Sequence, residues 1–214
     1  MKALSNQNRI SRIDEILSHK QPNLQIMLDD VQSSQNLSAI IRSCDAVGVL
    51  YLYYTARCND TLKVHKMITQ GAHRWLRRKH IATEDKVAFV EQKRAEGYQV
   101  VVTHLDENAV SFRSMDYTKP TLLIMGNEKE GVSEELLAKA DHKVIIPMQG
   151  MVQSLNVSVA TALILYEAQR QREAKGMYEI PQLELKEQEH IKEEWLYRDI
   201  IARRSKGKIG VPEE

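Results

Sequence analysis

Short, unbroken runs of apolar residues recur along this chain. A half-exposed strand alternates apolar and polar residues, whereas a continuous run is typical of a strand covered on both faces, as in a parallel sheet. Three runs have this character, at residues 100–102, 122–125 and 144–146, and residues 24–28 and 49–55 are also predicted to be strands. Helical segments lie between them, so the pattern predicts an α/β fold with a mostly parallel sheet flanked by helices.

Apolar residues at three- and four-residue spacing predict the helices. The expected helices span residues 8–19, 36–47, 60–70, 84–96, 133–140, 154–175 and 184–204. The helix from residue 154 differs from the others, because its first three turns are apolar nearly all round. A helix of this kind is buried on every side. In a chain this short, that favours packing against a partner subunit.

Three regions are predicted from these elements. We expect a short helical N-terminal arm at residues 1–20, one domain at 21–178 and a helical C-terminal arm with a basic end at 179–214. The 214 residues are 43% hydrophobic, which is enough for a buried core. Lys and Arg total 30 against 29 Asp and Glu, so the net charge is only +1. RNA binding would therefore require local basic patches.

Other classes of protein are excluded by what the sequence lacks. Cys44 and Cys58 have no CxxC spacing, so a disulfide framework is excluded and a reducing compartment fits. The histidines are scattered, and we expect no metal site. No apolar run approaches the roughly 20 residues of a membrane-spanning helix, and the N-terminus lacks the apolar segment of a secretory signal. We therefore expect a cytoplasmic protein without membrane association.

The candidate chemistry lies in three loops that follow predicted strands. Ligands of open parallel sheets bind beyond the carboxyl ends of the strands, and here those ends lead into residues 103–106, 126–131 and 147–156. Gly126 and Gly131 have the spacing of a phosphate-binding P-loop. However, Val132 and Ser133 replace the required Lys-Ser/Thr, which argues against that function. The chain also lacks a dinucleotide-binding GxGxxG fingerprint and a GxSxG nucleophile elbow.

Three segments resemble the three motifs of the SpoU/TrmH branch of the SPOUT methyltransferases, in the same order and at similar separation. They are residues 35–42 (QNLSAIIR), 124–131 (IMGNEKEG) and 145–160 (IIPMQGMVQSLNVSVA). The resemblance covers about residues 20–178. Ser34 departs from it, because the first motif often has proline there. Residues 103–110 and 165–172 are similar to the branch members that methylate guanosine 18 of tRNA.

The resemblance implies a C-terminal deep trefoil knot, S-adenosylmethionine held by the knot loops, and a homodimer whose active sites take residues from both chains. Cofactor-binding residues implied by the motifs are Thr103, Leu105, Gly126, Ile146, Met148 and Leu155. Catalytic residues implied by the motifs are Asn36, Arg42, Glu128, Ser154 and Asn156.

Each candidate also has an ordinary structural interpretation. Asn36 and Ser154 could cap helices, Arg42 could pair with Asp45 on a helix surface, and Glu128 could be a solvated loop acid. The resemblance instead makes Arg42 the residue that activates the ribose 2'-hydroxyl. A guanidinium is a poor proton acceptor. We therefore expect Arg42 to polarise this hydroxyl together with a nearby RNA phosphate.

Basic residues near the chain ends and in the 63–79 region are candidates for RNA contacts. Each could equally belong to a solvated face, but together on a dimer they could follow a folded tRNA, with steep salt dependence. The expected RNA-binding residues are Arg9, Arg12, Lys63, Arg74, Arg203 and Arg204.

The function expected from the resemblance is S-adenosylmethionine-dependent methylation of a tRNA ribose 2'-hydroxyl, at guanosine 18 of the D-loop. The same reaction on 23S rRNA or on the tRNA wobble ribose is an alternative, as are a non-catalytic RNA-binding knot protein and a small-molecule nucleotide binder. Intact Arg42, Glu128 and Asn156 argue against the non-catalytic protein, and the basic arms argue against the nucleotide binder. The expected macromolecular partner is tRNA and not DNA.

Overall fold

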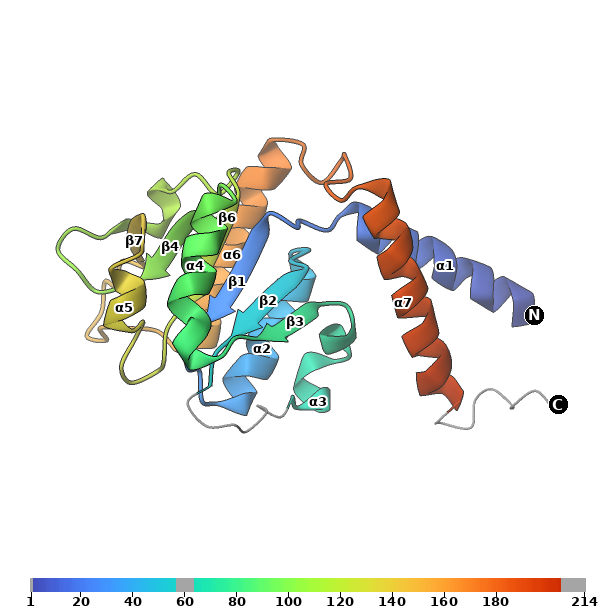
Figure 1. Ribbon diagram of the computed structural model, residues 1–214, viewed down its shortest axis with the longest axis horizontal. Coiled ribbons are helices and arrows are strands. Elements are labelled where there is room, and N and C mark those ends of the chain that lie inside the picture. Colours follow the sequence, from blue (N-terminus) through green and yellow to red (C-terminus); the bar gives the residue numbers. More distant parts are fainter. Residues whose placement is uncertain (1, 57–63, 205–214) are drawn as a thin grey trace. The chain divides into compact units, whose positions relative to one another are not determined.

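The structure, a computed structural model, describes residues 2–56 and 64–204, with side chains described for 7–56 and 64–197 (Figure 1). The chain forms two compact units. Gln21–Met177 is one, and the described parts of Met1–Lys20 and Tyr178–Glu214 form the other.

A seven-stranded sheet forms the centre of the 21–177 unit. Its order is β3-β2-β1-β6-β4-β7-β5, and every neighbouring pair is parallel. The strands are β1 (Leu24–Leu28), β2 (Tyr51–Tyr54), β3 (Arg77–His80), β4 (Gln99–Thr103), β5 (Val110–Ser111), β6 (Thr121–Met125) and β7 (His142–Ile145). The predicted α/β fold with a parallel sheet is confirmed.

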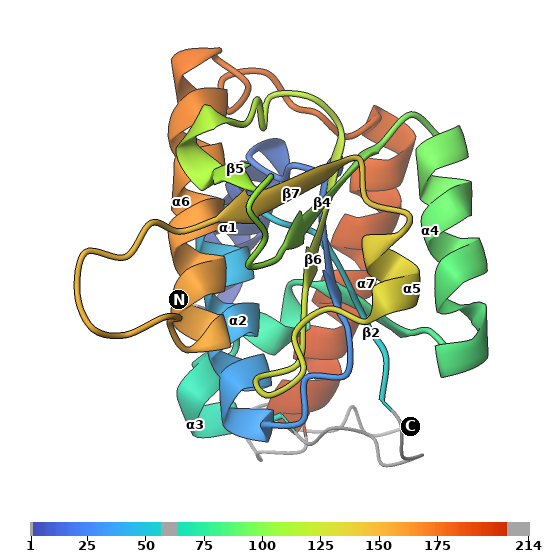
Figure 2. The same cartoon turned by 90° about the vertical axis from the view of Figure 1, so that its left-hand side faces the viewer.

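Helices cover both faces of this sheet. Figure 2 shows α2 and α6 on one face and α4 and α5 on the other. The helices of the unit are α2 (Ser34–Ala46), α3 (Lys66–Thr69), α4 (Lys86–Ala95), α5 (Glu134–Leu137) and α6 (Val157–Ala174), with short 3-10 turns at Ala72–Arg74, Thr83–Asp85 and Phe112–Ser114. Because both faces are covered, every residue of β1 and β6 is buried, which explains their largely apolar sequences.

The pairing of β1, β6 and β4 sets the edge at which a ligand would bind. Leu28 is in register with Met125, and Val102 with Ile124. The carboxyl ends of the three strands therefore meet at one edge of the sheet, as expected for an open parallel sheet. The loops that follow β6, β4 and β7 begin there.

Two predicted helix starts were wrong. Ser33, not Asn36, caps α2, and its side chain accepts a hydrogen bond from the Asn36 amide. Asn156, not Ser154, caps α6, and its side chain accepts from the amide of Ser158. Ser34 is thus the first residue of α2, a position that also suits proline. Its departure from the family motif is compatible with the same helix.

Further differences concern short or charged elements. Strands β3 and β5 were not predicted, because β3 consists of four basic residues and β5 is only two residues long. The predicted helix at 133–140 is shortened to α5. Within the described part of the predicted helix at 60–70, only α3 forms.

Helix α6 is not buried on all sides within one chain. Val159, Leu163 and Tyr166 are 47%, 42% and 51% exposed. Their spacing of four and three residues places them on one face of the helix. The sequence predicts burial on all sides of the helix, but the single chain leaves this apolar face exposed.

The described part of the terminal unit contains two helices, α1 (Lys2–Ser18) and α7 (Leu185–Arg204), which pack against each other. Ile13 and Leu17 of α1 and Trp195 of α7 are buried. The ammonium of Lys20 lies 5.7 Å from the centre of the Trp195 ring, a cation–π contact. Across the described part of the chain, a helix with the length and apolar character needed to cross a bilayer does not occur.

Candidate active site

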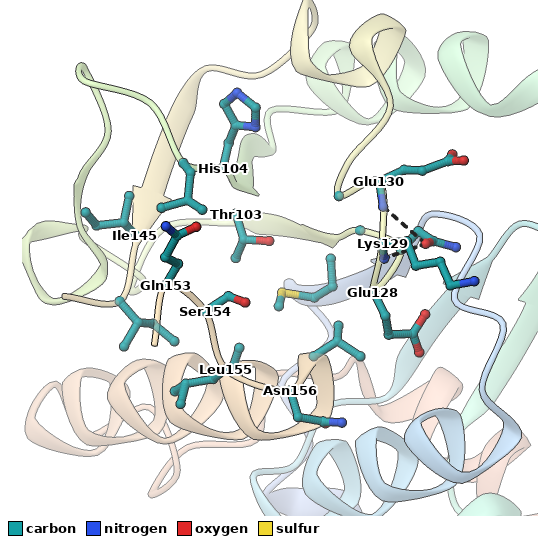
Figure 3. Close-up of a pocket in the computed structure, with 18 of the residues that line it drawn as sticks. Thr103, His104, Glu128, Lys129, Glu130, Ile145, Gln153, Ser154, Leu155 and Asn156 are labelled. Carbon is teal, nitrogen blue, oxygen red and sulfur yellow. Dashed lines mark hydrogen bonds between the residues drawn. The ribbon is translucent and has the colours of Figure 1, made fainter. Parts of the chain in front are cut away.

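A cavity of about 560 Å³ opens at the carboxyl edge of the sheet (Figure 3). Three loops line it, those following β4, β6 and β7, together with the start of α6. The structure brings all six expected cofactor-binding residues to this cavity, namely Thr103, Leu105, Gly126, Ile146, Met148 and Leu155. The walls combine apolar side chains with polar groups at strand ends, as small-molecule sites usually do.

The loop after β6 is folded into a tight ring. Asn127 and Gly131 exchange two backbone hydrogen bonds of 2.9 Å. The Asn127 side-chain oxygen also accepts from the amides of Lys129 and Glu130, the contacts drawn as dashed lines in Figure 3. A side chain at Gly126 would overlap the backbone of Gly131 and Val132, so this close approach requires glycine. The ring presents Glu128 outward at the rim of the cavity.

Three of the expected catalytic side chains form one hydrogen-bonded chain. The Asn156 amide nitrogen donates to the Asn36 side-chain oxygen over 3.1 Å, and the Asn36 amide nitrogen donates to Glu128 Oε1 over 2.7 Å. These residues come from the start of α6, the first turn of α2 and the β6–α5 loop. Segments up to 120 residues apart in the sequence therefore meet here.

The other two expected catalytic residues lie differently. Ser154 is exposed and lines the cavity next to Leu155 (Figure 3). Arg42 is exposed on α2, and its guanidinium donates to the backbone oxygen of Ile68 over 3.5 Å. Among the described residues that line the cavity, Arg42 does not occur. A single chain thus leaves Arg42 apart from Glu128 and Asn156.

An ion pair fastens the loop after β4. Lys143 Nζ lies 2.6 Å from Asp106 Oδ2, and the Asn108 amide donates to the other oxygen over 2.9 Å. The hydrogen bond from Lys143 and, next, the one from the Asn108 backbone lower the pKa of Asp106 to about 2. The carboxylate therefore stays charged throughout the physiological range, and it holds the segment that carries Thr103 and Leu105 to the cavity.

Of the expected RNA-binding residues, Arg74 lies in a basic cluster formed by Lys66, His73, Arg74 and Arg78. Burial, and then the charges of Arg78, Arg74 and Lys66, lower the pKa of His73. The Thr69 hydroxyl bonds His73 Nδ1 over 2.8 Å.

The remaining expected RNA-binding residues are in the terminal unit or outside the description. Arg9 is half-buried, and Arg12 is exposed and pairs with Glu15 over 2.8 Å. Arg203 and Arg204 end α7, but their side chains are outside the described set, and Lys63 is outside the described residues.

Sequence reasoning assigned no role to two residues that shape the site. Asn127 closes the ring after β6, and its amide nitrogen donates to the backbone oxygen of Asp30 over 2.7 Å. Gln153 lines the cavity beside Ser154. The position of Asn127 directly after a strand was a usable signal, whereas nothing in the pattern distinguished Gln153 from other polar loop residues.

Comparison with known proteins agrees with this geometry. Residues 23–166 match the SpoU rRNA Methylase family. A tRNA (guanosine(18)-2'-O)-methyltransferase of Aquifex aeolicus is 47% identical over 206 residues, covering 96% of this chain and 97% of the relative.

Two solved structures are also similar. The crystal structure of the A. aeolicus TrmH/SpoU tRNA modifying enzyme has a TM-score of 0.87 and 47% identity, covering 91% of this chain and 98% of that one. An AdoMet-bound rRNA methyltransferase from Sinorhizobium meliloti has a TM-score of 0.63 and 34% identity, covering 74% and 59%. With the family match spanning most of the 21–177 unit, this chain belongs to the SpoU rRNA methylase family.

Proposed function

We propose that this chain is an S-adenosylmethionine-dependent methyltransferase that modifies the ribose 2'-hydroxyl of guanosine 18 in the D-loop of tRNA. The observation that carries the proposal is the hydrogen-bonded chain Asn156–Asn36–Glu128 at the rim of a cavity at the carboxyl edge of the sheet. The name and the near-complete coverage of the Aquifex relative support the choice of tRNA and of guanosine 18.

The cavity fits the expected cofactor. Its volume of about 560 Å³ lies in the range of small-molecule sites. Backbone groups at the ends of β4, β6 and β7 could bind the polar parts of a nucleoside, and Ile146, Met148 and Leu155 could pack against its apolar parts. The AdoMet-bound relative supports this assignment. When bound, S-adenosylmethionine supplies an electrophilic methyl group on a sulfonium sulfur.

The protein's part in this reaction is mainly orientation. Orienting two reactants can supply about 7–11 kcal/mol of the barrier, whereas a general base typically contributes about 10²–10⁴-fold. Glu128 fixes the direction of the Asn36 and Asn156 amides, whose further donors can hold the ribose. Arg42 then polarises the 2'-hydroxyl together with an RNA phosphate.

We further propose a homodimer whose active sites each use residues of both chains. Two observations support it. Helix α6 exposes the apolar face of Val159, Leu163 and Tyr166, and Arg42 is exposed on α2, which packs on α6. A second copy that covers this face would bring its own α2 close to the site. Arg42 could thereby reach a reaction centre that it does not reach within one chain.

We also propose that the backbone after β6 passes through a trefoil knot, as the family resemblance implies. The strand order supports this proposal. Strand β4 lies between β6 and β7 although it precedes both in the chain, so the connection from β6 to β7 has to pass across β4.

The test is methyl transfer from labelled S-adenosylmethionine to unmodified total tRNA, followed by mapping of the modified ribose. Label at the 2'-oxygen of guanosine 18 is the expected result. Label at the wobble ribose, or on 23S rRNA supplied in a parallel reaction, would assign one of the alternative substrates. Cofactor uptake without transfer to any RNA would contradict the proposed activity.

A further inference from the structure

The 21–177 unit contains a buried ion pair that the proposed chemistry does not use. Asp29 directly follows β1 and Lys86 begins α4, and the two residues are only 2% and 4% exposed. Lys86 Nζ lies 3.3 Å from Asp29 Oδ1, 2.9 Å from Ser133 Oγ and 2.8 Å from Glu135 Oε1. Burying charged groups costs free energy even when they are paired, so the location of this pair calls for an explanation.

Asp29 holds the far end of the loop that carries Glu128. The Ser133 amide donates to Asp29 Oδ2 over 2.8 Å, and the Thr55 hydroxyl donates to Oδ1 over 3.3 Å. Ser133 is the residue at which the loop after β6 ends and α5 begins. Both oxygens of the carboxylate are therefore occupied, and one of them fixes the end of the loop.

The next residue, Asp30, holds the near end of the same loop. Its backbone oxygen accepts from the Asn127 side chain over 2.7 Å, and its amide donates to Thr55 Oγ1 over 2.9 Å. Asp30 has a φ of 55°. A residue other than glycine keeps this left-handed conformation where its surroundings hold it in place. The Asp29–Asp30 dipeptide is thus hydrogen-bonded to both ends of the loop that carries Glu128.

The same dipeptide is also the start of the segment that leads to Asn36. After Asp30 the chain enters α2, where Asn36 lies in the first turn and donates to Glu128. Asn36 is therefore joined to the Asp29–Asp30 dipeptide through the main chain. Glu128 is joined to the same dipeptide through the hydrogen bonds of its loop. A shift of Asp29 would change the distance between the two.

We infer that Asp29 and Lys86 are positioning residues. By anchoring the 126–133 loop to the end of β1, they fix the distance between Asn36 and Glu128. This inference rests on the proposed function for its kinetic consequence. Neither residue lines the cavity, so neither is expected to touch cofactor or RNA.

The experiment compares Asp29→Asn, Lys86→Met, the double variant and Val90→Ala in the full-length chain. Asparagine offers one acceptor oxygen where Asp29 uses two. Val90 is a fully buried residue of the same helix as Lys86, and its truncation lowers Tm through a cavity without touching the anchor. At saturating cofactor, we expect Asp29→Asn to lower kcat about 10-fold or more, with little change in the KM for tRNA. Val90→Ala should leave kcat unchanged.

The double variant separates positioning from stability. Lys86→Met leaves the buried Asp29 carboxylate without a counterion, whereas in Asp29→Asn the Lys86 ammonium keeps Glu135. Replacing both charges should therefore restore Tm relative to Lys86→Met. The kcat should stay low, because the loop has still lost its second acceptor. Recovery of kcat together with Tm, or equal kcat for Asp29→Asn and Val90→Ala, would show that the pair is merely structural.

A readout without turnover keeps this test apart from that of the proposed function. Hydrogen exchange of the 126–133 amides should quicken in Asp29→Asn and not in Val90→Ala. Unchanged exchange would overturn the inference whatever the activity. Faster exchange in Asp29→Asn, found together with a wild-type protein that methylates no RNA, would support the anchor and contradict the proposed function alone.

Discussion

The direction of each amide in the candidate site follows from one carboxylate. Glu128 can only accept hydrogen bonds when ionised, so the nitrogen of the Asn36 amide must face it. The Asn36 oxygen then faces Asn156, which must present its own nitrogen. The oxygen left on Asn156 accepts from the amide and hydroxyl of Ser158, at the start of α6. The hydrogen bonds from Asn156 through Asn36 to Glu128 therefore all run in one direction, as a site that orients its substrate requires.

Arg42 is the residue whose loss should separate catalysis from cofactor binding. It contacts Ile68 and lies outside the cavity of its own chain, so Arg42→Ala should abolish methyl transfer while the Kd for S-adenosylmethionine changes little. Arg42→Lys should recover little activity, because an ammonium lacks the planar fork of a guanidinium. Single-turnover transfer and calorimetry provide the two measurements.

A matched control exists for this change. Arg94 is also a half-exposed arginine of a helix, and it pairs with Asp141 over 2.7 Å. Arg94→Ala removes a guanidinium and a surface ion pair but leaves α2 intact, so its activity should match the wild type. Normal transfer by Arg42→Ala would remove Arg42 from the proposed mechanism.

At the scale of residues, the sequence could predict which loops meet but not which atoms bond. Asn36, Glu128 and Asn156 were candidates through the family motifs, and the structure joins them directly. The anchor residues Asp29 and Lys86 carried no signal. An acid after a strand and a lysine in the first turn of a helix are common at solvated surfaces, and only tertiary packing buries these two.

Among the helices and strands, α6 is the one most expected to contact a partner subunit. Leu163 lies at the middle of its exposed apolar face, so Leu163→Asp should place a charge in the proposed interface and convert the dimer to monomer. Activity should fall with it, because Arg42 would lose access to the partner's site. Sedimentation velocity measures the first effect and methyl transfer the second.

The polar end of α6 provides the control for this variant. Glu173 is exposed near the end of the helix, two turns beyond Tyr166, and Glu173→Gln should change neither mass nor activity. A Leu163→Asp protein that remains dimeric and active would show that α6 is not the interface.

The basic cluster around α3 should make stability depend on pH through His73. Burial and the neighbouring charges of Arg78, Arg74 and Lys66 lower the pKa of His73 below its usual 6.5. The folded state thus binds the proton less readily than the unfolded state. The free energy of unfolding should be unaffected above about pH 6.5 and decrease as the pH falls below it.

Urea unfolding between neutral pH and about pH 5 measures this slope. His73→Gln should flatten it, whereas His142→Gln, which changes an exposed histidine outside the cluster, should preserve it. An identical slope in wild type and His73→Gln would contradict the assignment.

Prediction of the elements succeeded where apolar residues are continuous and failed where they are not. The five predicted strands correspond to β1, β2, β4, β6 and β7, because strands covered on both faces need largely apolar sequences. Among the described strands, β3 lies at the edge of the sheet and pairs only with β2. An edge strand requires no apolar face, and charged residues there discourage pairing with other chains. Its basic sequence therefore carried no strand signal.

At the scale of the whole molecule, one buried arginine connects the ends of the 21–177 unit. Arg172 of α6 is fully buried, and its guanidinium donates to Tyr117 and Lys119 backbone oxygens and to the side chains of Gln21 and Asn23. The contacts join the entry of β1, the approach to β6 and the last helix of the unit. The cavity and its supporting contacts thus lie within 21–177, independently of the terminal unit.

This separation predicts the effect of removing the C-terminal arm. Deletion of residues 182–214 removes α7 and the basic residues beyond residue 197, so tRNA affinity should fall and its salt dependence should become shallower, since fewer phosphates are neutralised. Cofactor affinity should be unchanged, because every cavity-lining residue remains. Because the deletion also exposes Ile13 and Leu17 of α1, a second variant is needed that keeps the helix. In this variant Arg198, Arg203 and Arg204 are all replaced by Gln, which removes three charges. The same loss of salt dependence in both variants would assign RNA binding to the charges, and unchanged tRNA affinity in both would exclude the arm from RNA binding.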